Sequence, residues 1–363
     1  MEQLINITDA VFLGHVGEIE LGASAIAGIY YLAIYMLGFG FSIGLQVMVA
    51  RRNGEQDYKE TGKTFFQGLF FLLGLAIFLY LLIHTVSPFI LKKLIVSSDI
   101  YRAVILYLDW RSFGLLFSFP FLAIRSFLVG ITHTKALSWA AAIAVLINIP
   151  LNFYLIFTRE LGISGAAIAS SLAEMGSFMM LSFYMWIRLD KEKYGLRPVY
   201  NGNLLIKVLK LSIWSMLHAF ISVAPWFLFF VSIEHLGKIE LAISNITRSV
   251  SAIFFVIANS FALTTGSLVS NAIGAGEGKA QMTFLFQVTT TAIYLVYLYW
   301  LCRYTQALLA IYLTAEYVFV ILLATQSIFY LKNRHKAQRN AKFYINKCRS
   351  ASCMQGGLKQ ASA

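Results

Sequence analysis

Apolar runs long enough to cross a lipid bilayer dominate this sequence. About 20 helical residues span a hydrocarbon core of about 30 Å, and this criterion predicts spans near 22–49, 62–84, 105–130, 136–157, 163–187, 208–232, 239–265 and 282–302. Hydrophobic residues make up 59% of the chain and charged residues 13%, which excludes a soluble globular protein. The runs do not alternate like barrel strands, so the sequence predicts an all-α polytopic membrane protein.

A short polar loop occurs twice, each time at the start of a long apolar run. Residues 14–28 read GHVGEIELGASAIAG and residues 234–248 read EHLGKIELAISNITR. The register holds over a shift of 220 positions as far as Lys59 and Lys279. This internal duplication predicts two pseudo-symmetric bundles of about six helices each, an N-lobe and a C-lobe.

The longest polar connection, residues 188–207, lies where the duplication requires a boundary. It is a predicted cytoplasmic linker between an N-lobe at 1–187, whose first helix is partial, and an incomplete C-lobe at 208–331. Residues 316–331 are too short to span. The basic tail at 332–363 suits either a cytoplasmic tail held at anionic lipid or translation out of frame, and we favour the second. The chain is therefore expected to be truncated at both ends.

Lysine and arginine in the short loops set the expected orientation. They are more frequent in and around 50–63 and 188–207 than in the loops on the other side, so we expect these two loops in the cytoplasm. The net charge of +12 largely reflects this bias and the basic tail, and nucleic acid is not an expected partner. Cys302, Cys348 and Cys353 have neither metal-ligand spacing nor an even count, so no metal site is predicted.

Three segments in combination resemble the multidrug and toxic compound extrusion (MATE) family of transporters, in particular its NorM-like members. They are ITDAVFLGHVGEIELGASAIA near the N-terminus, INIPLNFYLIFTRELGISGAAIASSLAE at 147–174 and LVSNAIGAGEGKA at 268–280, within a resemblance that covers about residues 1–314. The resemblance implies two six-helix bundles facing one another around a central cavity. It also implies export of organic cations or other amphipathic compounds in exchange for Na⁺ or H⁺.

The resemblance further implies a monomer in the lipid bilayer of the cell membrane, with the bacterial inner membrane as the expected location. No cofactor is expected besides the coupling ion, Na⁺ or H⁺, and the expected partners are small amphipathic or cationic substrates. We do not expect an enzyme, because no His-Glu-x-x-His, Gly-x-Ser-x-Gly or paired catalytic aspartate motif occurs.

Asp9 is the first candidate for the coupling residue. It lies among Ile5, Ile7, Ala10 and Val11, and a carboxylate in such surroundings is costly unless it is paired, hydrated or protonated. One interpretation is a carrier of H⁺ or Na⁺. The alternative is a carboxylate at a wet terminus or at the outer interface.

Asn148 and Asn152 are four residues apart and therefore share a helix face. Pro150 between them frees the carbonyl of Leu146 as a further oxygen for a cation or water. The alternative is a pair that bonds neighbouring helices together. The resemblance implies a cation site, because the family's N-lobe site uses an Asp in the first helix and two polar residues at this spacing in the fifth. Many members carry Asp where this chain has Asn152.

Ser170 matches a Ser or Thr that the family places near this site, and Glu174 lies one turn further along the same face. Glu174 is a second candidate proton carrier, or else a group hydrated in a cytoplasmic vestibule. Asp109 and Arg111 are expected to neutralise one another or to be hydrated at the interface. Arg248 is expected to snorkel outward.

Other functions remain open at this point. A lipid-linked substrate flippase of the same fold would need several basic side chains in its cavity, and this chain places few basic residues in the middle of its helices. A non-functional truncated remnant is the third alternative. The prediction that the residues favour is small-molecule efflux.

Overall fold

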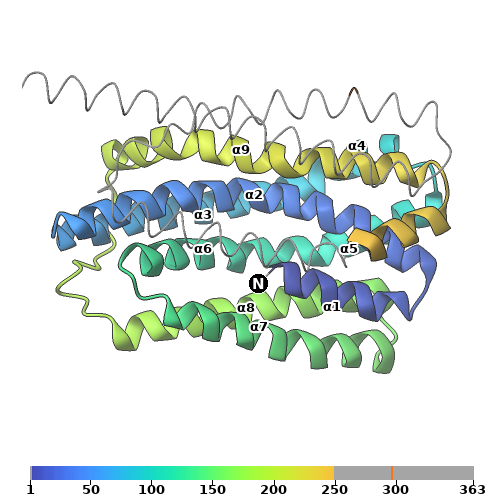
Figure 1. Cartoon of the computed structure of the whole chain (residues 1–363), viewed down its shortest axis with the longest axis horizontal. Coiled ribbons are helices and arrows are strands. Elements are labelled where there is room, and N and C mark those ends of the chain that lie inside the picture. Colours follow the sequence, from blue (N-terminus) through green and yellow to red (C-terminus); the bar gives the residue numbers. More distant parts are fainter. Residues whose placement is uncertain (1, 249–295, 297–363) are drawn as a thin grey trace, which may run out of the picture. The chain divides into compact units, whose positions relative to one another are not determined.

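The computed structural model describes residues 2–248 and 296, and helices make up most of them (Figure 1). The helices are α1 (Glu2–Gly14), α2 (Glu18–Gly54), α3 (Tyr58–Thr85), α4 (Ser87–Leu94), α5 (Ser98–Arg111), α6 (Leu115–Gly130), α7 (Lys135–Phe153), α8 (Gly162–Arg188) and α9 (Gly202–Glu234). A 3-10 turn, Ser112–Gly114, joins α5 to α6, and a π-helical turn, Tyr154–Thr158, extends α7. Residues 238–248 are again helical. The described residues contain no strand.

In the described part of the chain, six helical segments are long and apolar enough to cross a membrane. One of these segments consists of α5, the 3-10 turn and α6 together. They coincide with the first six predicted spans, so the predicted class, an all-α polytopic membrane protein, is confirmed. The seventh span, 239–265, is helical as far as it is described, to residue 248. The span at 282–302 apart from residue 296, the segment 316–331 and the tail at 332–363 lie outside the described residues.

The helices pack in successive layers (Figure 1). α9 lies along α2, which also packs on α3, α5 and α6, while α8 lies between these helices and α7. α1 packs on α2, α7 and α8. Asp9 on α1 is therefore brought next to the polar residues of α7 and α8.

The duplication predicted from the two polar loops is visible in their hydrogen bonds. The Nδ1 atoms of His15 and His235 each lie 2.8 Å from the carbonyl oxygen four residues earlier. Gly17 and Gly237 each precede a new helix, and in both copies the glutamate three residues later folds over the glycine. A Cβ atom at either glycine would collide with that glutamate side chain. The two loops therefore share the same local arrangement of glycine and glutamate.

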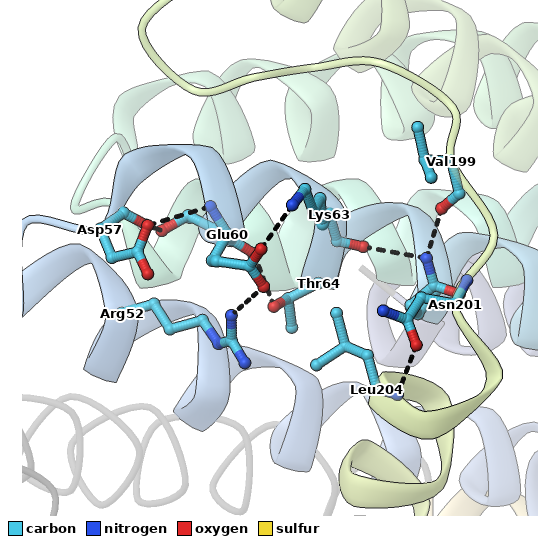
Figure 2. Close-up of polar contacts among 10 residues, drawn as sticks. Arg52, Asp57, Glu60, Lys63, Thr64, Val199, Asn201 and Leu204 are labelled. Atoms are coloured by element: carbon cyan, nitrogen blue, oxygen red, sulfur yellow. Dashed lines mark hydrogen bonds and ion pairs between the residues drawn. The ribbon is translucent and has the colours of Figure 1, made fainter.

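The connection between α8 and α9 is held against α3. The non-helical part is 189–201, shorter than the predicted linker at 188–207, because α8 continues to Arg188 and α9 begins at Gly202. The Gln67 side chain donates to the Val199 carbonyl at 2.6 Å and accepts from the Asn201 N–H at 2.9 Å. Asn201 Oδ1 accepts from the Leu204 N–H at 3.2 Å, which caps α9 (Figure 2).

Beside this connection, Glu60 joins the end of α2 to the start of α3. Its carboxylate accepts from Arg52 Nη1 at 2.7 Å and from Lys63 Nζ at 2.6 Å (Figure 2). Asp57 caps α3 by accepting from the Glu60 N–H at 3.3 Å. These contacts lie at the end of the helices where the sequence predicts the cytoplasm.

Candidate cation-binding site

Asp9 lies in the interior, where three uncharged donors reach its carboxylate. Ser170 Oγ donates to Oδ2 at 2.6 Å, and the Nδ2 atoms of Asn152 and Asn148 donate to Oδ1 at 2.9 and 3.4 Å. Asp9 is 3% exposed, so the alternative of a wet terminus is wrong. A carboxylate held by neutral groups keeps a negative charge available to a cation.

Asn148 and Asn152 occupy one buried face of α7, as their spacing predicts. Asn152 Nδ2 also donates to Asn148 Oδ1 at 3.1 Å, and Asn148 Nδ2 donates to Ser170 Oγ at 3.2 Å. Among the described residues no donor reaches Asn152 Oδ1, although it is buried. Asn148 and Asn152, together with Asp9 and Ser170, are here called the Asp9 cluster. The cluster therefore contains an amide oxygen that can accept a hydrogen bond or bind a cation.

Pro150 lies on the opposite face of α7. Both Pro150 and Leu146 are exposed, whereas the two asparagines are fully buried. The side chains of residues 146 and 150 therefore share a face that those of 148 and 152 do not. The expectation that the freed Leu146 carbonyl offers an oxygen to a cation or water stays a prediction.

Glu174 is buried one turn from Ser170, with a charged partner that the sequence analysis did not find. Arg111 Nη2 donates to Glu174 Oε1, and the Tyr31 hydroxyl donates to Glu174 Oε2 at 3.3 Å. The Arg111 Cζ atom also lies 3.9 Å from the centroid of the Tyr31 ring. Glu174 is fully buried, so the alternative of a hydrated vestibule is wrong.

The expected pairing of Asp109 with Arg111 is wrong for a geometric reason. Residues two apart on a helix point in nearly opposite directions. Arg111 is fully buried against Glu174, whereas the half-exposed Asp109 carboxylate lies 3.9 Å from His84 Nε2. An arginine within an apolar run indicates a buried partner, but the partner of Arg111 is Glu174, 63 positions further along the chain.

A cavity of about 10 Å³ adjoins Asp9, close to the volume that one water needs. Its lining comes from α1, α2, α5 and the helix at 238–248, and consists of Asp9, Ala10, Ser24, Gly28, Tyr107 and Arg248. Arg248 Nη2 donates to Asn245 Oδ1 at 2.9 Å. The expectation that Arg248 snorkels outward is therefore wrong, because its side chain faces the Asp9 cavity.

Residues 1–154 match the model of the MatE family. The chain is 23% identical over 293 residues to a probable multidrug resistance protein NorM of Idiomarina loihiensis, covering 77% of this chain and 62% of that protein. It is 26% identical over 283 residues to multidrug and toxin extrusion protein 1 of Mus musculus, covering 76% of this chain and 48% of that protein. The chain thus spans less than two thirds of the length of these relatives.

Solved structures share the fold. An inward-facing multidrug resistance MATE family transporter of the MOP superfamily superposes with a TM-score of 0.67 at 15% identity, covering 90% of this chain and 95% of that one. The eukaryotic MATE transporter AtDTX14 gives a TM-score of 0.66 at 18% identity, covering 90% and 75%. The spans and this fold are those of a multi-pass membrane protein. In sequence, the chain is similar to the MatE family over residues 1–154 and is NorM-like over 77% of its length.

Proposed function

We propose that the protein is a secondary active efflux transporter that exchanges Na⁺ or H⁺ for organic cations or drugs across the membrane. The relatives named multidrug resistance protein and multidrug and toxin extrusion protein support this direction of transport. The proposed location is the cell membrane, in bacteria the inner membrane. The proposed substrates are small amphipathic or cationic compounds.

The single observation that carries the proposal is the buried Asn152 Oδ1, which no described donor reaches, on a side chain whose Nδ2 donates to Asp9. A buried acceptor is costly without a donor or a cation. A proton on the Asp9 cluster would supply a donor, and Na⁺ would be bound by the oxygens of Asp9, Asn148, Asn152 and Ser170. Hard monovalent and divalent cations prefer such oxygen ligands, so the cluster suits either coupling ion.

Exchange requires that the cation change the balance between two states of the transporter. α1 carries Asp9 and contacts α2, α7 and α8. We propose that cation binding at Asp9 neutralises the buried charge and so favours a different packing of α1 against α7 and α8. The substrate then leaves from the state that the cation favours.

The alternative, a lipid-linked substrate flippase, needs free positive charge to bind a pyrophosphate group. In the described part of the chain, Arg111 is the most deeply buried arginine, and Glu174 neutralises it. This pairing removes one of the basic groups that a flippase would need.

The test is export of a fluorescent organic cation from vesicles that contain the full chain and carry an imposed Na⁺ or H⁺ gradient. Asp9→Asn should abolish gradient-driven export, because an amide cannot be protonated or carry the charge that binds Na⁺. Asp109→Asn is the matched control, since this carboxylate is half-exposed and should be dispensable. Undiminished export by Asp9→Asn would contradict the proposal.

A further inference from the structure

The buried pair of Arg111 and Glu174 is built from three helices. Arg111 ends α5, Glu174 lies on α8, and Tyr31 on α2 contacts both of them. Ser171 Oγ donates to the Trp110 carbonyl at 3.0 Å, which ties the end of α5 to α8. The pair is therefore fixed in place by its surroundings rather than exposed to solvent.

The pair lies next to the Asp9 cluster. Ser170, which donates to Asp9, precedes Glu174 by one turn of α8. Tyr107, one turn before Arg111 on α5, lines the same small cavity as Asp9. The Arg111 guanidinium also attracts the Asp9 carboxylate electrostatically. One arginine thus acts on two buried carboxylates.

The formal charges of these three buried groups add up to one negative charge. Arg111 contacts Glu174 directly, whereas the donors to Asp9 are uncharged. We infer that Arg111 neutralises Glu174 and thereby keeps the negative charge of Asp9 available to the coupling cation. Arg111 is then a positioning residue for cation binding, and Glu174 is its counter-ion. This inference rests on the proposed function of the Asp9 cluster.

Arg248 also lines the Asp9 cavity, from the helix at 238–248, and donates to Asn245. It is the same in every variant of the Arg111–Glu174 pair, so the differences between these variants report the pair alone. Changing either member of the pair should therefore change cation binding, and changing both should not.

The predicted effects of the variants differ in sign. Glu174→Gln leaves Asp9 facing an uncompensated arginine, so the formal charge falls to zero and cation affinity should drop about tenfold or more. Arg111→Gln leaves two carboxylates, so the cation should bind at least as tightly as in the unaltered chain. The double variant restores one negative charge, and its affinity should return to within about threefold of the unaltered chain.

The experiment measures cation binding to the purified full chain in lipid nanodiscs. In one arm Na⁺ replaces choline at alkaline pH, and in the other protons are added without Na⁺; intrinsic tryptophan fluorescence reports binding in both. The arm that responds identifies the ion. Arg125→Gln is the matched control, because its guanidinium lies over Phe39, 5.3 Å from the ring centroid, rather than against Glu174. Its affinity should be unchanged.

A merely structural pair would behave differently. If the pair is only structural, cation affinity should fall in both single variants or stay unchanged in Glu174→Gln. Either result would overturn the inference. A double variant whose cation affinity is as low as that of Glu174→Gln would overturn it as well. Arg111→Lys keeps the positive charge, so its cation affinity should be unchanged. If a single variant fails to fold, Arg111→Lys and the double variant together still test the inference. A cation response that survives Asp9→Asn would instead contradict the proposed function.

Discussion

At the scale of single residues, spacing along a helix predicted the Asp9 cluster well. The i, i+4 relation placed Asn148 and Asn152 on one face, and the resemblance connected that face to Asp9 and Ser170. In the structure the other three residues each donate a hydrogen bond to Asp9. Their role in cation coupling stays a prediction.

Spacing could not predict the partners of the buried charges. Arg111 and Glu174 are far apart in sequence, and only the packing of α5 on α8 brings them together. Arg248 likewise reaches the Asp9 cavity from the second repeat. An isolated arginine in an apolar run signals a buried partner, but the partner's identity depends on tertiary packing that one sequence does not give.

Asn152 gives the next prediction. Asn152→Asp would place a second carboxylate 2.9 Å from Asp9 or closer, at the position of the present amide. Two carboxylates this close cannot both stay ionised without a cation between them. We expect apparent affinity for the coupling cation to rise about tenfold, measured as tryptophan fluorescence against Na⁺ or proton concentration.

Asn201→Asp is the control for that variant. It makes the same chemical change at the N-cap of α9, where Asp caps as well as Asn does. Cation affinity and stability should both stay as they are. An Asn152→Asp variant with unaltered affinity would show that the Asp9 carboxylate and the residue 152 side chain do not share a cation.

At the scale of helices, the sequence predicted the spans because their length and apolarity are local properties. It did not predict α4, a helix of only eight residues, or the 3-10 turn between α5 and α6. These short elements are set by packing. The same holds for the close approach of α2 and α9, which depends on glycines rather than on hydrophobicity.

Gly44 on α2 tests that approach. A Cβ atom there would lie 2.8 Å from Ser212 Cα on α9, so Gly44→Ala should destabilise the protein by about 1–3 kcal/mol. Gly74→Ala on α3 is the control, because a Cβ at Gly74 meets nothing within 4 Å, and alanine there should be neutral or stabilise by up to about 1 kcal/mol. Thermal unfolding in detergent measures both. Equal melting temperatures for the two variants would show that α2 can move away from α9 at little cost.

At the scale of the described molecule, the second repeat is joined to the N-lobe at the end opposite the α2–α3 loop. The Glu234 carboxylate accepts from the N–H groups of Val96 and Ser97 at 3.1 and 2.8 Å. Lys238 Nζ lies 2.7 Å from Asp99 Oδ2, and Asn245 Nδ2 donates to the Leu21 carbonyl at 2.8 Å. Both partners of the Lys238–Asp99 pair are substantially exposed, so it contributes little. The buried Glu234 and Asn245 are therefore the polar side chains that hold the second repeat against the N-lobe at this end.

Glu234→Gln should loosen this closure. An amide has one acceptor oxygen, so one of the two backbone N–H groups would face the Gln NH₂ group instead of an acceptor. The cost is about 1–3 kcal/mol, which corresponds to an opening about 5- to 150-fold more frequent. Ser24→Cys, in the Asp9 cavity, reports the opening through its rate of reaction with a charged thiol reagent, in a background with Cys302, Cys348 and Cys353 replaced by serine. Glu55→Gln, at the other end, is the control and should leave the rate unchanged. An equally slow reaction in Glu234→Gln would mean that apolar packing, such as Leu241 against Gly22, holds this end closed without the carboxylate.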